Sequence, residues 1–475
     1  MPYIGRDTDK ISNVEVLDNI TFDGSSSYTL QKGGSNFTPS SANTLLLSID
    51  GVVQAGNFTV SGSTIDFGTA VAGTSTCDFV LHYGVGLITA PSDGSVTEAK
   101  IGTGAVTSAK LASGAVPNQS AFKNIIINGD MSIAQRGTSV SSITGADYYT
   151  VDRWQIYMAN SGTYTQSQST DVPSGQGFAK SLKMDCTTAA ASPIAGAQLY
   201  LRTKFEGQNL QYLKYGTSSA ESMTLSFWVK CNKATTASVQ LQDHDNSKMV
   251  TKSYIINSAD TWEKKTITFN GNTSNSFTND ANLSLDVRWW LESGSDFTSG
   301  TPSGDWEAND NTKRNNNNLA LSSSTSNEFY ITGVQLEAGT SASDFEFLPF
   351  GVNQQRCQRY YYTFVDKRTS GVSPVTEQNS IGTGVTHYGN QMVVSISMPV
   401  NMRTIPSVDQ VTGTDYFQYY HDQTGDNFDS FNNISGNGVT SMMISNTNQI
   451  SATVGTCGIV YATNAAAVVA FEAEL

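Results

Sequence analysis

The chain has 475 residues and a net charge of −14 from 27 basic and 41 acidic side chains, a length that corresponds to about three domains. No cluster of lysine or arginine occurs, which argues against nucleic acid or an anionic membrane surface as a partner. No apolar run reaches the ~18 residues of a transmembrane helix, and the first residues lack the apolar core of a signal peptide, so we expect the chain to fold in a cytoplasm.

The composition predicts an all-β chain with long loops. Charged residues make up only 14% of the sequence, whereas glycine, serine, threonine and asparagine are abundant and apolar residues alternate in short runs. The five cysteines are odd in number and show neither a CxxC pair nor a zinc-ligand spacing. We expect buried free thiols, no metal and no cofactor.

Residues 1–90 predict a small antiparallel β domain, a β-sandwich. The run 45–49 enters Asp50-Gly51 and returns as 52–54, and Asp-Gly between apolar runs indicates a two-residue hairpin because both central residues need positive φ. A second hairpin is predicted within 58–67, and 77–83 supplies a further strand.

Residues 91–118 contain a ten-residue repeat, VTEAKIGTGAVTSAKLASGAV from position 96. Its large apolar residues recur every five positions, which fits neither the 3.6-residue period of a helix nor the two-residue period of a strand. These residues are Val96, Ile101, Val106, Leu111 and Val116. Within one chain they cannot offset an ordering cost of about 1–2 kcal/mol per residue. We interpret the repeat as a stalk in which three parallel copies of the chain wind together; a flexible Gly/Ala/Ser linker is the alternative.

Residues 119–352 form the largest block, and their short strands and long polar loops predict a two-sheet jelly roll. The run 223–231 alternates apolar and polar residues, and the strand around 329–336 changes phase at Gly333, as a β-bulge would. The Gly/Ser/Asn-rich run 293–318 is predicted to be an exposed loop. The triplet 243–245, Asp-His-Asp, could contact a cation, and a polar loop between strands explains it equally well.

Trp290 is the first candidate receptor-binding residue. In 283–291 the odd positions are apolar, and the other face is polar apart from Trp290. An aromatic ring beside Asp286 and Arg288 suits sugar stacking, because CH groups pack on the ring while hydroxyls meet the charged groups. The alternative is that a loop or a neighbouring subunit covers Trp290. We expect Trp154, by contrast, in the core.

Residues 353–475 predict a separate C-terminal β-sandwich, the tip domain, whose last alternating strand runs to Leu475. Within it, turn compositions flank 414–433, so we expect an exposed loop, a common place for recognition. Tyrosine offers a large face and a hydroxyl at low entropic cost. The candidate receptor-binding residues are Tyr416, Phe417, Tyr419, Tyr420 and His421. The alternative is that they pack between subunits.

Several stretches resemble tail fibres of tailed phages, especially those of marine cyanobacteria. The opening MPYIG, LLLSIDGVVQ at 45–54, FTVSGSTIDF at 58–67 and the repeat that follows are similar to the virion-attachment end of such fibres. NIIINGDMSIAQRGTS at 124–139, DRW at 152–154 and ITGVQLEAGTSASDFEF at 331–347 resemble a carbohydrate-binding-module-like domain that recurs in them, and 352–364 is similar to the junction after that domain.

The resemblance implies a homotrimeric virion fibre, assembled in the host cytoplasm and acting at the host cell surface. Its N-terminal domain would dock on a tail adaptor or nozzle protein, and its C-terminal domains would bind a host-surface glycan or an outer-membrane receptor. No GxSxG, P-loop, HExxH or GxGxxG motif occurs, so we expect a non-enzymatic adhesin. A polysaccharide-degrading tailspike is one alternative, because two carboxylates about 5–10 Å apart suffice for glycoside cleavage; a secreted carbohydrate-binding protein is another.

The repeat leads to a prediction about oligomeric state. Since its apolar residues have no expected partners within one chain, we expect a homotrimer with a parallel threefold axis along residues 91–118. Light scattering on the intact chain should give three times the mass of one chain, and a monomer mass would contradict the stalk.

Overall fold

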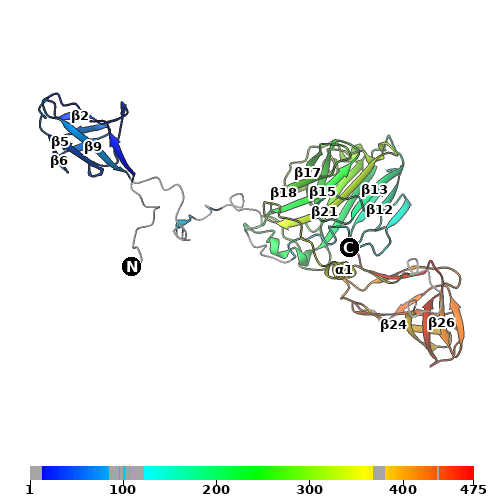
Figure 1. Cartoon of the computed structure of the whole chain (residues 1–475). Coiled ribbons are helices and arrows are strands. Elements are labelled where there is room, and N and C mark those ends of the chain that lie inside the picture. The colour runs from blue at the N-terminus through cyan, green and yellow to red at the C-terminus, as the bar shows by residue number, and fades with distance from the viewer. Residues whose placement is uncertain are drawn as a thin grey trace, which may run out of the picture. The chain divides into compact units, whose positions relative to one another are not determined.

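The computed structural model describes residues 13–84, 96, 100–102, 106, 122–366, 380–435 and 438–475 (Figure 1). The chain divides into two compact units, Met1–Pro117 and Asn118–Leu475. The predicted all-β fold is confirmed, because antiparallel sheets make up both units. Among the described residues, no helix has the length and apolarity needed to cross a membrane.

The first unit is a small β-sandwich, as predicted. Its four-stranded sheet (order β1-β9-β5-β6) and three-stranded sheet (β2-β8-β7) share one core, which includes Leu30, Leu47 and Ile65. At the confirmed Asp50-Gly51 turn, φ is 50° and 78°. The elements are β1 (Asn13–Leu17), β2 (Ser27–Thr29), β3 (Gln31–Lys32), β4 (Ser35–Asn36), η2 (Ala42–Thr44), β5 (Leu45–Ile49), β6 (Val52–Gln54), β7 (Thr59–Ser61), β8 (Thr64–Asp66) and β9 (Cys77–Gly84).

Three of the five apolar residues of the repeat lie within the described part of the chain. Val96, Ile101 and Val106 are 51%, 42% and 48% exposed. Leu111 and Val116 lie outside the described residues. Apolar side chains this exposed in a single chain are compatible with the predicted stalk and with a linker, so the trimer stays a prediction.

The second unit begins with the jelly roll, two six-stranded sheets around one large core (Figure 1). The first sheet has the order β10-β12-β13-β21-β15-β18 and the second the order β11-β14-β19-β16-β17-β20. The strands of the first sheet are β10 (Ser139–Ile143), β12 (Thr163–Ser169), β13 (Ser181–Thr188), β15 (Met223–Cys231), β18 (Glu263–Phe269) and β21 (Glu328–Ala338). Those of the second are β11 (Gln155–Ala159), β14 (Gln198–Glu206), β16 (Thr235–Asp243), β17 (Lys248–Ile256), β19 (Leu283–Ser293) and β20 (Glu307–Ala308). Short 3-10 helices η5 (Gly207–Asn209), η6 (Gln211–Leu213), η7 (Ser295–Phe297), η8 (Asn311–Lys313) and η9 (Leu321–Ser323) lie in the connections.

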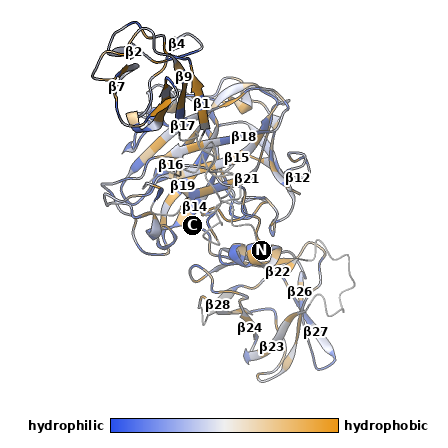
Figure 2. Ribbon diagram, turned by 60° about the vertical axis from the view of Figure 1, so that its left-hand side comes forward, coloured by the Kyte–Doolittle hydropathy of each residue, from blue (hydrophilic) through white to orange (hydrophobic). Residues whose placement is uncertain are grey.

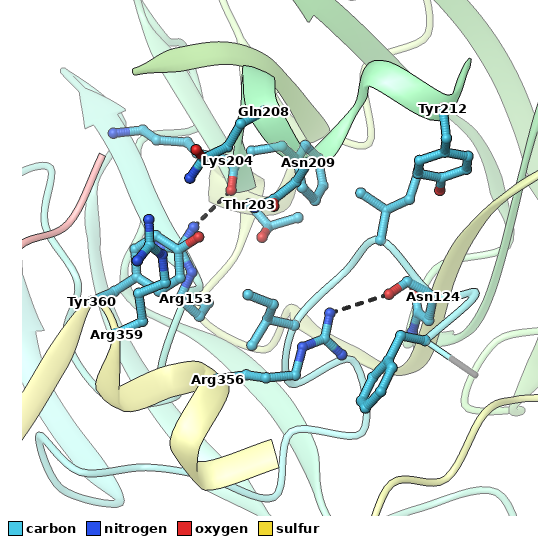
Figure 3. Close-up of a pocket in the computed structure, with 14 residues that line it drawn as sticks. Asn124, Arg153, Thr203, Lys204, Gln208, Asn209, Tyr212, Arg356, Arg359 and Tyr360 are labelled. Carbon is cyan, nitrogen blue, oxygen red and sulfur yellow. Dashed lines mark hydrogen bonds between the residues drawn. The ribbon is translucent and has the colours of Figure 1, made fainter. Parts of the chain in front are cut away.

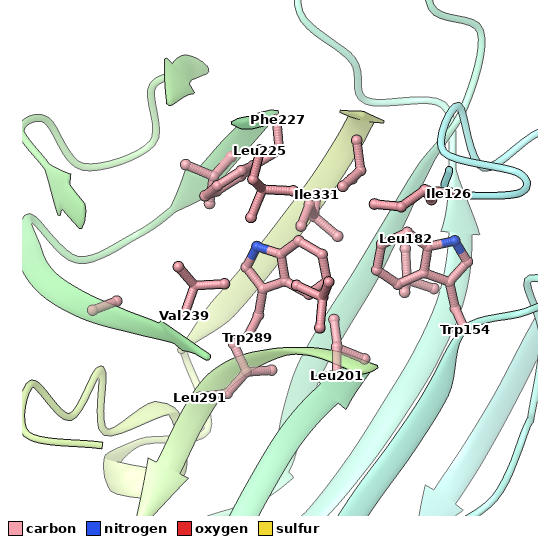
Figure 4. Packing of buried hydrophobic residues seen from close by; sticks show 14 of the residues in the cluster. Ile126, Trp154, Leu182, Leu201, Leu225, Phe227, Val239, Trp289, Leu291 and Ile331 are labelled. Carbon is pink, nitrogen blue, oxygen red and sulfur yellow. The ribbon is translucent and has the colours of Figure 1, made fainter. Parts of the chain in front are cut away.

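Two tryptophans pack at the centre of the jelly-roll core (Figure 4). Trp154 and Trp289 are completely buried, with ring centroids 5.3 Å apart. The Trp154 indole Nε1 donates to the carbonyl of Asn128 at 3.1 Å, so its one polar atom is satisfied. Trp154 is therefore a core residue, as predicted. The predicted bulge at Gly333 is also confirmed, since its φ is 59° and the β15–β21 register shifts opposite it.

The run 293–318 was predicted to be an exposed loop, and this is wrong for part of it. Asn315 is completely buried and donates from Nδ2 to Ser293 Oγ at 2.7 Å, and Asn318 donates to Glu292 Oε1 at 2.7 Å. The asparagine amides thus act as hydrogen-bond anchors that hold the segment against the outer face of the second sheet. Composition alone did not distinguish this role from a solvated loop.

The tip domain is a second sandwich with its own core, in which Met392, Val394 and Phe417 are completely buried. It contains a three-stranded sheet (β22-β31-β25) and a seven-stranded sheet (β27-β26-β30-β23-β24-β29-β28). Figure 2 shows hydrophobic and hydrophilic residues mixed along the strands of the molecule, as half-buried strands require. The strands are β22 (Tyr361–Asp366), β23 (Ser380–Tyr388), β24 (Gln391–Ser397), β25 (Ser407–Val411), β26 (Phe417–His421), β27 (Thr424–Phe428), β28 (Asn433–Ser435), β29 (Ser441–Asn446), β30 (Cys457–Ala462) and β31 (Val468–Glu472).

Four cysteines are buried and free, as predicted, and Cys457 is exposed, which corrects the prediction of five buried thiols. Cys457 opens strand β30 at a position whose side chain faces away from the tip core. The buried thiols are Cys77, Cys186, Cys231 and Cys357.

Helix α1 (Phe350–Gln358), which the sequence did not predict, joins the jelly roll to the tip domain. Across this junction, buried Arg153 pairs with Glu474, whose side chain is 5% exposed. The Arg153 guanidinium also lies over the ring of Tyr360 at 3.5 Å and donates to the Lys204 carbonyl at 2.7 Å. Strand β31 ends at Glu472, short of the predicted Leu475, because the last residues turn to meet these jelly-roll groups. A buried charge pair therefore ties the last residues of the tip domain to the jelly roll.

We predict that Glu474→Ala destabilises the second unit by about 3–5 kcal/mol, since it leaves the buried Arg153 charge without its carboxylate. Glu221→Ala is the matched control, because the Lys214–Glu221 pair is solvent-exposed and should contribute less than about 1 kcal/mol. All six tryptophans lie between 154 and 306, so tryptophan fluorescence during urea unfolding of the full chain reports on the second unit. Equal midpoints for the two variants would contradict the role of the pair.

Candidate functional site

An aromatic row crosses the outer face of the second jelly-roll sheet. Tyr157 on β11 stacks on Tyr200 on β14, with ring centroids 4.9 Å apart and an interplanar angle of 9°. Tyr200 contacts Trp290 on β19 at 4.8 Å, and Trp290 contacts Phe297 of η7 at 5.7 Å. The row follows from strand pairing, since Tyr157, Tyr200 and Trp290 occupy paired positions on three neighbouring strands.

Trp290, predicted to be a sugar-stacking residue, is completely buried, so this assignment is wrong. The alternative stated for it holds in part, because Phe297 from the 293–318 segment covers it within the same chain. Its indole Nε1 donates to Gln240 Oε1 at 3.2 Å, which explains how the ring is accommodated among polar residues. Trp290 therefore packs against Tyr200 within the row and is not accessible to a ligand.

Charged side chains surround the Tyr157 end of the aromatic row. Arg202 lies with its guanidinium carbon 5.4 Å from the Tyr157 ring centroid, and its Nε donates to Gln155 Oε1 at 2.6 Å. Completely buried Asp286 accepts from Arg288 Nε at 2.9 Å. Burial raises the pKa of Asp286, but Arg288 outweighs it, with His244 and Arg202 adding to the effect, so the pKa lies well below its usual range. Tyr157 itself is half-buried on this face, beside an Asp286 carboxylate that stays ionised.

The triplet 243–245 does not converge on one point. Asp243 accepts from Asn246, His244 Nε2 lies 3.2 Å from Asp286 Oδ2, and Asp245 accepts from Thr278. Across the described residues, no group of three or more histidine, cysteine or acidic side chains is arranged to hold a metal ion. The polar-loop interpretation of the triplet accounts for each of its side chains.

The segment 414–433 was predicted to be a loop, and this is wrong: it contains the hairpin β26–β27. Asp422 and Gln423 form its turn and both take the positive φ that a two-residue hairpin turn requires, 44° and 60°, although neither is glycine. The loop prediction was wrong because the polar residues of this segment occupy the outward-facing positions of an alternating strand pattern. Phe417, Tyr419 and His421 point inward and are buried, whereas Tyr420 points outward and is 44% exposed.

The hairpin therefore leaves few of the candidate residues available to a receptor. Tyr419 Oη donates to the carbonyl of Thr456 at 2.7 Å, and His421 Nε2 lies 3.0 Å from Asp426 Oδ2. Tyr416 is half-buried against the tip core. Of the five aromatic and histidine candidates in the tip, Tyr420 is the exposed one.

The sequence interpretation missed Tyr157, Tyr200 and Arg202. A signal was present, because Ile156 and Met158 are buried core residues that alternate with Gln155, Tyr157 and Ala159. What the sequence did not contain was the pairing of β11 with β14, which brings the two tyrosines together.

Comparisons with known proteins give weak similarities. No family model and no curated protein matches the chain. Among solved structures, the enzymatically active domain of tailspike protein 4 from bacteriophage CBA120 matches at 14% identity over 46% of this chain and 22% of that chain, with a TM-score of 0.27. A putative sugar binding protein from Bacteroides thetaiotaomicron matches at 13% identity over 45% and 99%, with a TM-score of 0.24. The family 11 carbohydrate-binding module of a Clostridium thermocellum cellulase matches at 14% identity over 42% and 99%, with a TM-score of 0.19. Similarities of this strength carry no argument about function.

The two neighbouring tyrosines of the hairpin should behave differently. Tyr419→Ala removes a fully buried ring and should destabilise the tip domain by about 3–5 kcal/mol, whereas exposed Tyr420→Ala should change its stability by less than about 0.5 kcal/mol. Because the tip domain contains no tryptophan, hydrogen–deuterium exchange of the β30 amides is the suitable measurement. Equal protection in both variants would contradict the inward and outward assignment.

Proposed function

We propose that the protein is a tail fibre of a tailed phage: a non-enzymatic virion protein that attaches to the tail by residues 1–90 and binds a host-surface polysaccharide with residues 119–475. The order of parts supports the fibre assignment, because a small β unit and an apolar decapeptide repeat precede two large β-sandwiches. The sequence resemblance runs through the same parts in the same order. On this proposal the protein is assembled in the host cytoplasm, forms a homotrimer, and docks on a tail adaptor or nozzle protein.

The observation that carries the glycan-binding part is the stacked Tyr157–Tyr200 pair. A sugar ring binds an aromatic face through its CH groups and needs polar partners nearby for its hydroxyls. Tyr157 offers the face, and Gln155 and Arg202 lie beside it with their mutual hydrogen bond at 2.6 Å. Tyr200 fixes the orientation of Tyr157, so little conformational entropy is lost on binding.

The same face gives little support to the alternative of a polysaccharide-degrading tailspike. Glycoside cleavage needs one carboxyl group that keeps its proton as the general acid. Asp286, the buried carboxylate of this face, is held ionised by Arg288, His244 and Arg202. We therefore propose binding without hydrolysis, which an assay for reducing ends released from the bound polysaccharide tests directly.

We expect Tyr157→Ala to weaken binding at least about tenfold, as loss of a central aromatic contact does. The experiment measures binding of the labelled full chain to a panel of bacterial cells, and to polysaccharide extracted from a strain that binds. Tyr83→Ala is the matched control, because Tyr83 is 42% exposed in the N-terminal unit, which is not expected to contact the host.

Unchanged binding in a folded Tyr157→Ala variant would overturn the assignment of this face. Equal losses in both variants would show that the measurement reports exposed tyrosines in general, and would also overturn it. Tryptophan fluorescence confirms that the variant sandwich is folded.

A further inference from the structure

A cavity of about 370 Å³ opens where the jelly roll meets helix α1 (Figure 3). It lies apart from the Tyr157 row: its walls come from the 122–127 segment, β14, the η5–η6 connection and α1 with the residues just after it. The volume is in the range of small-molecule sites, which are ~300–1,000 Å³. Four cations line it, Arg153, Lys204, Arg356 and Arg359, and the lining residues include no aspartate or glutamate.

Three of these cations already pair with, or donate hydrogen bonds to, groups of the protein that do not line the cavity. Arg153 pairs with Glu474, and Arg359 donates to Glu206 from Nε at 2.8 Å and from Nη2 at 2.7 Å. Burial lowers the pKa of Lys204 to about 7, and its Nζ donates to the Leu475 carbonyl. The positive charges of these three side chains are therefore already balanced or reduced, and little of them remains for a ligand.

Arg356 differs from the other three cations. Among the described residues, no carboxylate lies within ion-pair distance of it: its Nη2 donates to the Asn124 carbonyl at 3.3 Å, and its guanidinium carbon lies 5.8 Å from the Phe122 ring centroid. Its guanidinium reaches into the middle of the cavity beside Asn124 (Figure 3). Burial lowers the pKa of the Arg356 guanidinium, although Cys357, Glu346 and Tyr360 act in the opposite direction. A partly desolvated arginine of this kind is a ready partner for an anion.

The other lining groups suit a sugar. Phe122 and Tyr212 line the cavity and are 56% and 49% exposed; the Arg356 guanidinium lies 5.8 Å from the Phe122 ring centroid, and Tyr212 offers an aromatic face for CH contacts. The amide side chains of Gln208 and Asn209 are also exposed in the lining and can meet hydroxyl groups. One arginine that pairs with no carboxylate of the described residues matches the single negative charge of a sugar carboxylate.

We propose that this cavity binds an acidic sugar residue, with Arg356 pairing to the sugar carboxylate. The anion site follows from the geometry of the cavity alone, and the sugar rests on the proposed function. The Tyr157 face and this cavity are separate sites, so loss of one leaves the other intact.

The test is isothermal titration calorimetry of the full chain with galacturonate, glucuronate and N-acetylneuraminate, with their methyl esters as uncharged counterparts and with inorganic phosphate. We expect saturable binding of at least one of the three acids, at least ~10-fold tighter than its methyl ester. Arg356→Gln should weaken that binding ~10-fold or more, and Arg356→Lys should retain part of it. Arg314→Gln is the matched control, because it removes the same charge from a guanidinium that donates to Asn309 and Asn311 outside the cavity.

Four results would overturn the proposal: no saturable binding of any of the three acids, equal binding of acid and ester, phosphate binding as tight as the acid, or an equal loss in Arg314→Gln. If Arg356→Gln does not fold, as tryptophan fluorescence would show, Tyr212→Ala at the exposed rim takes its place and should weaken the acid and its ester together. None of these readouts depends on Tyr157, so failure here and failure of the glycan face remain distinguishable.

Discussion

The second unit depends on a charge that its fold has buried. Arg153 is 1% exposed, and a cation in that position costs several kcal/mol unless it is paired and hydrogen-bonded. Its partners come from distant parts of the chain: Glu474 near the C-terminus, the Lys204 carbonyl on β14 and the Tyr360 ring after α1. The jelly roll satisfies this arginine only when the tip domain is in place. The pairing is one of the contacts that join the two cores within the single compact unit 118–475.

The same junction explains why a basic cavity exists in a chain of net charge −14. Docking the tip domain brings α1 and its arginines beside β14, where Arg153 and Lys204 already lie. Each buried carboxylate that the junction supplies neutralises one of these cations, as Glu206 does for Arg359. In the described part of the chain, Arg356 has no carboxylate partner because its side chain extends from α1 into the cavity and not toward these carboxylates. Selective pairing, and not an overall basic surface, produces the positive site.

Much of the fold could be predicted from local patterns, and the exposed surface could not. The Asp50-Gly51 hairpin and the Gly333 bulge follow from backbone requirements that a few neighbouring residues set. Whether Trp290 meets solvent depends instead on Phe297, a residue in a loop that periodicity cannot place. The prediction of a loop at 414–433 was wrong for a related reason. The Asp422-Gln423 turn has positive φ at two non-glycine residues, so its composition resembles that of a loop. Arg356 lies on a nine-residue helix that the all-β expectation did not contain.

Two of the tyrosines accessible to a ligand lie at or next to a sheet edge. Tyr157 lies on β11, an edge strand of its sheet, and Tyr420 on β26, next to an edge strand. Tyr200, one strand further into its sheet, is buried and packs against Tyr157 and Trp290. Small contact areas of this kind bind a sugar weakly on their own. If three chains share one stalk, as proposed, each further contact becomes intramolecular at an effective concentration of about millimolar, so avidity can exceed single-site affinity ~10²–10⁴-fold. Weak, separate glycan contacts are therefore sufficient for a trimeric fibre, whereas a monomeric binding protein with the same sites would require a larger and better-covered groove.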